Sequence, residues 1–439
     1  MKTKKIFAVL LAASMLLAMG TGCSKKSQGS TKSFKIPEQE NPTGHVDTVK
    51  RENGQTAIFE LAAGTPSTMS DEQLVRAYSE FEFNLLSQCA SDTDTNLMIS
   101  PDSVLFALDM AAAGANGETL NQLLATTVPG ADQVSAFTFA KNRMASLRGD
   151  QLQIANSAWF NKDRGVPFYE DYLTFIHDNF DAEVSTLSMD GQALDTINKW
   201  ISDHTKGRIP KMLNNLDPNT ACLLVNAMVF DGTWKNTYED WQVYKDDFHQ
   251  TSTKSQKVTY LYNTESIYVR NDSAQGFIKL YDGDQYAFMT ILPNDSSISI
   301  NEYVSNMTAA DYWALWDNRD YTDVEATFPE FTSGYRTNME DYLQAMGVED
   351  AFQDKADFSN MSSVSPHISQ VIHQTYIKVD RNGTEAAAAT VVAMEDGCAL
   401  VEDPIPVVKC DRPFAYAIVD METGLPVFIG TVNDVESPN

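Results

Sequence analysis

The side chains most able to do acid–base or metal chemistry near neutral pH are the six histidines of the chain. No two of them stand at the spacing of a metal site, so we expect no metal. Acidic pairs such as Asp246 and Asp247 lie in loop-like contexts, which indicates a solvated surface rather than a catalytic cleft. The histidines are His45, His177, His204, His249, His367 and His373.

The motifs of common hydrolases and nucleotide-binding enzymes are also missing from the sequence. It contains no G-x-S-x-G elbow, no H-E-x-x-H and no phosphate-binding P-loop. Residue chemistry alone therefore identifies no catalytic constellation, and we expect neither an enzyme nor a cofactor.

The five cysteines lack the C-x-x-C spacing of a zinc site. Cys89 and Cys222 stand in apolar patterns and are expected to be buried small hydrophobes. Cys398 and Cys410 flank an acidic loop, and a disulfide between them in an oxidising compartment is left open by the sequence.

One stretch, from Asn382 to Val408, has an unusual composition. It begins with "NGTEAAAATVVAM", which is nearly uncharged and made of small residues, and continues as an acidic segment whose first proline is Pro404. Alanine favours a helix, but the stretch lacks the apolar spacing of a core-facing helix.

The rest of the chain is predicted to consist of an export signal, a linker and a folded domain, in that order. Lys2, Lys4 and Lys5 precede the apolar run 6–19, which is typical of a signal peptide over 1–22. The "LAMGTGC" stretch ending at Cys23 resembles a bacterial lipoprotein signal, in which that cysteine is lipidated. Gly20 departs from this pattern, so lipidation and plain secretion both stay open.

Residues 23–69 are polar and predict a tether, with the body at 70–439. Ser70 and Gln73 form a capping box before a helix, and Pro101 begins a second. Helical spacing also covers 166–180, 192–206 and 309–317, whereas strands are expected at 221–230, 285–293, 414–420 and 427–432. This order predicts an α+β fold with mostly antiparallel sheets.

The composition is compatible with a large body of this class. The chain has 439 residues, of which 43% are hydrophobic. Its formal net charge of −28 favours solubility and argues against a nucleic-acid partner.

The stretch after Asp380 closely resembles the reactive-loop hinge of serpins, a family of metastable protease inhibitors. Further resemblances follow in the family's order over some 360 residues. They are "NLMISPDSV" (96–104), "INKWISDHTKGRI" (197–209), "LVNAMVFDGTW" (224–234), "FPEF" (328–331), "MGVEDAFQDKADFS" (346–359), "ISQVIHQTYIKVD" (368–380) and "DRPFAYAIVD" (411–420).

The resemblance implies three mostly antiparallel β-sheets, eight to nine helices and an exposed reactive loop at about 381–408. It also implies a mechanism, in which a serine protease attacks the loop and forms an acyl-enzyme. The cut loop then inserts as a strand into the main sheet and traps the protease. The partners implied are extracellular serine proteases, bound by a monomer that meets the membrane only through its lipid.

The hinge sequence suits insertion, since strand residues alternate between two faces. Thr384, Ala386, Ala388 and Thr390 share one face, and no charge falls on it before Asp396. The other face holds Glu385, Ala387 and Ala389. Burying an unpartnered charge is costly, so the uncharged face favours inhibition over a non-inhibitory carrier role, which remains the alternative.

The scissile bond is expected within 397–402, and its position there stays open. The candidates are Gly397, Cys398, Ala399, Leu400 and Val401, with the Cys398–Ala399 bond first and a bond after Leu400 next. Small and apolar residues suit elastase- or chymotrypsin-like pockets. No Arg or Lys lies between Arg381 and Lys409, so trypsin-like targets are not expected.

The resemblance also assigns roles outside the loop. Gly383 is the hinge pivot, and Trp234 marks the point where the loop first enters the sheet. Arg381 stands where the family commonly has a glutamate, so the family's usual salt bridge cannot form. The effect of this change on the energy needed to open the main sheet is not decided by the sequence. The polar cluster that governs sheet opening corresponds to Ser100, Ser103, Asn226 and His373.

Overall fold

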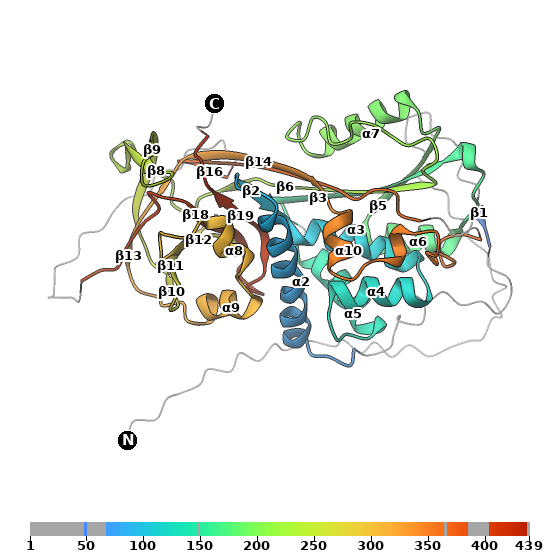
Figure 1. Cartoon of the computed structure of the whole chain (residues 1–439), viewed down its shortest axis with the longest axis horizontal. Coiled ribbons are helices and arrows are strands. Elements are labelled where there is room, and N and C mark those ends of the chain that lie inside the picture. The colour runs from blue at the N-terminus through green and yellow to red at the C-terminus, as the bar shows by residue number, and fades with distance from the viewer. Residues whose placement is uncertain (1–47, 51–66, 148, 364–366, 385–403, 437–439) are drawn as a thin grey trace, which may run out of the picture. The chain divides into compact units, whose positions relative to one another are not determined.

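The computed structural model describes residues 48–50, 67–147, 149–363, 367–384 and 404–436. The predicted α+β class is confirmed (Figure 1). In the part of the chain that is described, no helix is both long and apolar enough to cross a membrane.

Nine α-helices lie in the described residues. Ser70 caps the first of them with Gln73 in the predicted capping box, and Pro101 opens the second, as predicted. The helices are α2 (Asp71–Ser91), α3 (Pro101–Gly114), α4 (Gly117–Thr127), α5 (Gln133–Ser146), α6 (Glu170–Phe180), α7 (Gly191–His204), α8 (Ile300–Ser305), α9 (Ala309–Asp317) and α10 (Glu340–Ala345).

One antiparallel sheet of six strands contributes many of its residues to the main hydrophobic core. Its spatial order is β10 (Tyr268–Arg270), β11 (Ala274–Leu280), β12 (Tyr286–Pro293), β18 (Phe414–Asp420), β19 (Pro426–Val432) and β2 (Leu97–Ile99). Beside it lies a four-stranded sheet in the order β17 (Val407–Lys409), β13 (Val324–Pro329), β9 (Ser255–Glu265) and β8 (Val243–His249).

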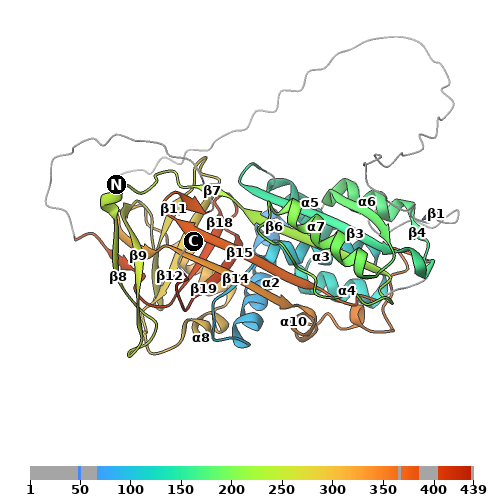
Figure 2. The ribbon, with the colours of Figure 1, turned by 90° about the horizontal axis from the view of Figure 1, so that it is seen from above.

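A long layer of strands consists of two sheets side by side. The first is β5 (Ala182–Leu187), β3 (Leu152–Asn161) and β6 (Cys222–Phe230), and the second is β14 (Phe331–Asn338), β15 (Ile372–Asp380), β16 (Gly383–Thr384) and β7 (Gly232–Thr233). β6 runs beside β15 (Figure 2), but no ladder joins them within the described residues. We call the boundary between β6 and β15 the seam.

β6 is buried on both faces, which explains why its residues are apolar apart from Asn226. Leu223 and Val225 pack against Ile197 and Ile201 of α7, on one side of the layer. Met228 belongs to the main core, which contains residues of α2 and α3 on the other side (Figure 1). The strand predicted at 221–230 is therefore confirmed.

Part of the predicted tether pairs with the body. Thr48–Val49 form β1, which runs parallel to β4 (Phe168–Tyr169). The hydroxyl of Ser67 also lies 2.9 Å from that of Ser135, close to the start of α5. The remaining elements are three short 3₁₀ helices, η1 (Lys162–Arg164), η2 (Asp240–Gln242) and η3 (Asp350–Phe352).

Candidate functional site: the seam and its hinge

The top of the seam is occupied by the hinge strand β16. Thr384 is paired with Val379 of β15 on one side and with Gly232 of β7 on the other. Its side chain is buried, and its hydroxyl lies 2.6 Å from that of Tyr281. Thr384, a residue of the hinge sequence, thus already lies between two strands.

Gly383 is required here by a close backbone approach. A Cβ atom added to it would lie 2.1 Å from the carbonyl oxygen of Gly232 and 2.8 Å from the Cα of Thr233. Any larger residue would push β16 away from β7. The resemblance assigns Gly383 as the hinge pivot, and the structure adds a packing reason for a glycine at this position.

Trp234 fastens the turn that leads into β16. Its indole Nε1–H donates to the carbonyl of Asp380 at 2.9 Å, and its backbone N–H donates to the carbonyl of Asn382 at 2.9 Å. The ring is buried and stacks on Tyr281, with 4.4 Å between centroids. The predicted entry-point tryptophan therefore contacts the hinge directly.

Arg381 forms an ion pair in which it supplies the positive charge, whereas the family's usual residue at this position, a glutamate, is negative. Its Nη1 lies 2.8 Å from Oδ1 of Asp240, and its backbone N–H donates to Oε1 of Glu330 at 3.1 Å. Burial raises the pKa of Glu330, and the hydrogen bond and charge of Arg381 oppose that shift. The two carboxylates come from distant segments, so no local sequence signal linked them to Arg381.

Halfway down the seam, three of the four predicted cluster residues are connected. The backbone N–H of Ser100 donates to Nε2 of His373 at 3.1 Å, and the N–H of Ser103 donates to Oγ of Ser100 at 3.3 Å. Burial lowers the pKa of His373 to about 4, so the imidazole is neutral at pH 7. The histidine is thus a hydrogen-bonded core residue that ties β15 to the start of α3.

The fourth residue, Asn226, lies on the other side of the seam and bonds elsewhere. Its Nδ2 donates to Oδ1 of Asn156 at 2.7 Å, and Asn156 in turn donates to the carbonyl of Phe180. The buried Oδ1 of Asn226 has no hydrogen-bond partner among the described residues. The predicted cluster is therefore two groups, and Asn156 was missed because its strand is distant in sequence.

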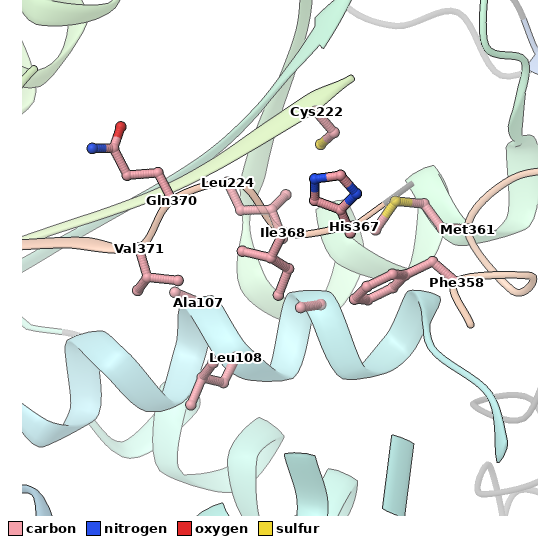
Figure 3. Close-up of a pocket in the computed structure, with 11 residues that line it drawn as sticks. Ala107, Leu108, Cys222, Leu224, Phe358, Met361, His367, Ile368, Gln370 and Val371 are labelled. Atoms are coloured by element: carbon pink, nitrogen blue, oxygen red, sulfur yellow. The ribbon is translucent and has the colours of Figure 1, made fainter. Parts of the chain in front are cut away.

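Below these groups, an apolar pocket opens under the seam (Figure 3). Cys222 and Leu224 of β6 form one side, and Ile368 and Val371, just before β15, form the other. Figure 3 shows helix α3, with Ala107 and Leu108, along the floor. The full lining is Ala107, Leu108, Ala111, Cys222, Leu224, Phe358, Met361, His367, Ile368, Gln370 and Val371.

Several predicted residues lie outside the described residues. They are Cys23, the hinge residues Glu385, Ala386, Ala387, Ala388, Ala389 and Thr390, and the scissile candidates Gly397, Cys398, Ala399, Leu400 and Val401. Cys89 and Cys410 are buried and Cys222 is half-buried. Within the described part, no three His, Cys, Asp or Glu side chains are grouped to hold a metal ion.

Comparison with known proteins identifies a family model and several relatives that match most of this chain. Residues 76–435 match a family model described as Serpin (serine protease inhibitor). An uncharacterized serpin-like protein of Methanosarcina mazei is 29% identical over 418 residues, covering 88% of this chain and 94% of the relative. Iripin-8 of Ixodes ricinus is 28% identical over 405 residues, covering 86% and 98%.

Solved structures agree on the fold. The crystal structure of a thermophilic serpin, tengpin, in the native state has a TM-score of 0.76 and 35% identity, covering 84% of this chain and 96% of that one. Human thyroxine-binding globulin in complex with its hormone has a TM-score of 0.73 at 23% identity, covering 83% and 99%, which bears on the fold alone.

Proposed function

Because this chain belongs to the serpin family and shares its fold, we propose that it inhibits extracellular serine endopeptidases as a suicide substrate. The protease cuts the reactive loop and forms an acyl-enzyme, and the loop inserts into the seam before hydrolysis is complete. The observation that carries this proposal is the register of β16.

That register predicts where each further loop residue would pair. Thr384 is opposite Val379 and Gly232, and both pairings are antiparallel. For each residue further along the loop, the expected partner on β15 is therefore one residue earlier in the sequence. On the other side, the expected partner is also one residue earlier, first in β7 and then in β6. Extended in this way, the inserted strand faces the buried side of the layer with every second residue, beginning with Thr384.

The polar groups of the seam support this register. Six residues beyond Thr384, Thr390 is predicted to lie opposite His373 on β15 and Asn226 on β6. The unpaired Oδ1 of Asn226 is an acceptor that the Thr390 hydroxyl suits. A buried polar group that lacks a partner in one state is expected to gain one in the other.

The pocket of Figure 3 supports it as well. In the same register, Val392 is opposite Val371 and Leu224, and Met394 is opposite Cys222, three residues that line the pocket. Apolar side chains entering there would gain about 0.8 kcal/mol for each buried methylene. The loop residues that the sequence makes apolar would thus meet apolar walls.

The finer features of the proposal rest on the sequence. The target is an elastase- or chymotrypsin-like protease, which cuts the loop within 397–402. The protein acts outside the cell, held by lipid on Cys23 or secreted. The first experiment mixes the mature domain with pancreatic elastase, neutrophil elastase, chymotrypsin, subtilisin and trypsin.

Boiled denaturing gels and mass spectrometry of the released C-terminal peptide then give the answer. A band at the summed mass of the two proteins is expected with an elastase- or chymotrypsin-like enzyme, and the peptide mass identifies the bond. Cleavage without such a band, and without a rise in thermal stability, would favour the non-inhibitory carrier instead. Arg381 is the feature that favours this second function, because it replaces the glutamate that commonly forms a salt bridge in the family.

A further inference from the structure

The pocket under the lower part of the seam has almost wholly apolar walls. Nine of its eleven lining residues are apolar, and His367 and Gln370 are the other two (Figure 3). Burial raises the pKa of the Cys222 thiol, so this sulfur is an uncharged part of the wall at pH 7. Apolar cavities in proteins stay dry and bind small apolar molecules. The walls therefore suit a small, mostly apolar ligand.

Backbone contacts fix these walls in the uncut protein. The N–H of Met361 donates to the carbonyl of Gly114 in α3 at 3.0 Å, and the N–H of Ile368 donates to the carbonyl of Ala351 at 2.8 Å. A Cβ atom added to Gly114 would lie 2.7 Å from the Cβ of Met361, so a glycine is needed for this wall to pack against α3. A preformed pocket binds its ligand without the entropy cost of ordering its walls.

His367 supplies a hydrogen-bonding group at the edge of the pocket. Its side chain is about half exposed, and Figure 3 shows one nitrogen of its ring facing the sulfur of Cys222. Its Nδ1 lies 3.9 Å from Oδ1 of the fully exposed Asp354, and an ion pair of this kind contributes little. Imidazole has two ring nitrogens and Nε2 takes no part in that pair, so it can bond to a hydroxyl group of a ligand.

The charges near the pocket disfavour an anionic ligand. Among the described residues that line it, none is Lys or Arg. The carboxylate of Asp354 lies beside His367, and the whole chain has a formal net charge of −28. An organic acid entering the pocket would lose its hydration without meeting a side chain that is always cationic. An uncharged molecule with one hydroxyl group avoids that cost.

We propose that this pocket is a regulatory site for a small, uncharged aromatic molecule, whose ring lies between β6, α3 and Ile368 and whose hydroxyl group bonds to His367. Its regulatory role rests on the proposed inhibitory function. In the register given above, Val392 and Met394 enter the same pocket, and their two side chains together have a bulk similar to that of one phenol molecule. A bound ligand must therefore leave before the loop can insert fully, and the fraction of cleaved loops that trap the protease falls.

The binding test uses phenol and the uncut mature domain, and it needs no protease. Ligand-observed NMR titrations measure the affinity for phenol and for benzoate, which keeps the ring but is charged at pH 7. We expect a Kd of about 1 mM for phenol, and binding of benzoate that is weaker by about tenfold or more.

Two variants test where phenol binds. Ala107→Leu, at a half-buried position on α3, should fill the pocket and weaken phenol binding by about tenfold or more. His367→Ala should weaken it by about two- to tenfold, because one hydrogen bond is lost. Thermal midpoints check that both variants fold, and the half-exposed His367 position carries the test if Ala107→Leu does not.

His177→Ala is the matched control, because the His177 side chain is 43% exposed and lies in α6, outside the lining of the pocket. It should bind phenol as wild type does. Equal affinity of wild type and His367→Ala for phenol would overturn the site. So would benzoate binding as tight as that of phenol, or the lack of any saturable binding of phenol.

The regulatory test measures the stoichiometry of inhibition of whichever panel protease forms the covalent complex, with and without phenol at several times its Kd. The stoichiometry should rise with phenol for wild type and for His177→Ala, and much less for His367→Ala. An unchanged stoichiometry for wild type at saturating phenol would overturn the regulatory role. Trapping without phenol binding would remove the site and leave the inhibitory function. Phenol binding by a protein that traps no protease would remove the inhibitory function and its regulation, and would leave the binding site.

Discussion

The hydroxyl of Thr384 lies 2.6 Å from the hydroxyl of Tyr281, and both side chains are buried beneath the top of the long layer. Tyr281 in turn stacks on Trp234, which holds the turn into β16. Gly383 and Thr384 are therefore docked in the intact protein, and the proposed insertion would extend an existing strand.

Tyr281→Phe should destabilise the protein by about 1–3 kcal/mol, because it leaves the Thr384 hydroxyl buried without its partner. Thr384→Val should cost a similar amount for the reciprocal reason. The double variant should lose much less than the sum of the two, since no polar group is then left unpaired. Urea unfolding of the four proteins measures this cycle. Simple additivity would show that the two hydroxyls do not interact.

Thr390→Arg should convert the inhibitor into a substrate. The register assigns Thr390 to the buried face between His373 and Asn226, where an unpartnered charge costs several kcal/mol. Insertion would then be slow relative to deacylation. The ratio of the deacylation rate to the insertion rate should rise about tenfold for each 1.4 kcal/mol added to the insertion barrier, and the stoichiometry of inhibition should rise with it.

Ala387→Arg is the control for that variant, because alternation assigns Ala387 to the opposite face, where the register sets it beside the exposed Tyr376. It should retain most of the covalent complex on a denaturing gel. The reverse ranking of the two variants would mean that the loop inserts one residue out of the proposed register.

The sequence predicted those parts of the fold that have local signals. The helix at Ser70 was identified from its capping box, and β6 from a run too apolar for a strand with one exposed face. Helices α4, α5, α8 and α10 were missed, whereas α3 begins at the predicted Pro101. Local patterns identify an element only where its periodicity or its caps are clear.

The site was predicted unevenly for a related reason. The hinge alanines and Thr384 can be recognised from the local sequence alone. The partners of Arg381, in contrast, lie 51 and 141 positions away along the chain. Asn156 bonds to Asn226 across 70 residues of sequence. Such contacts are set by strand pairing, which composition and spacing do not determine.

Arg143 should be the most sensitive charged residue of the body. Its Nη2 lies 2.8 Å from Asp102 and its Nη1 lies 2.7 Å from Asp420, and all three side chains are buried. Arg143→Met would leave two buried carboxylates without their cation, which typically costs about 3–5 kcal/mol. Lys199→Met removes a fully surface pair and should cost under about 1 kcal/mol. Equal urea midpoints for the two variants would contradict this ranking.

Acidification should weaken the protein through His373. Burial lowers its folded-state pKa to about 4, below the ordinary value of about 6.5, so the unfolded chain takes up a proton that the folded chain refuses. The stability from this site is complete above pH 6.5 and is lost as the pH falls towards 4, by about 3 kcal/mol in all. Protonation would also remove the Nε2 lone pair that accepts the Ser100 N–H. In urea unfolding at pH 7.5, 6.0, 5.0 and 4.5, the stability advantage of wild type over His373→Asn should therefore shrink. A constant gap between wild type and His373→Asn would show that His373 titrates alike in both states.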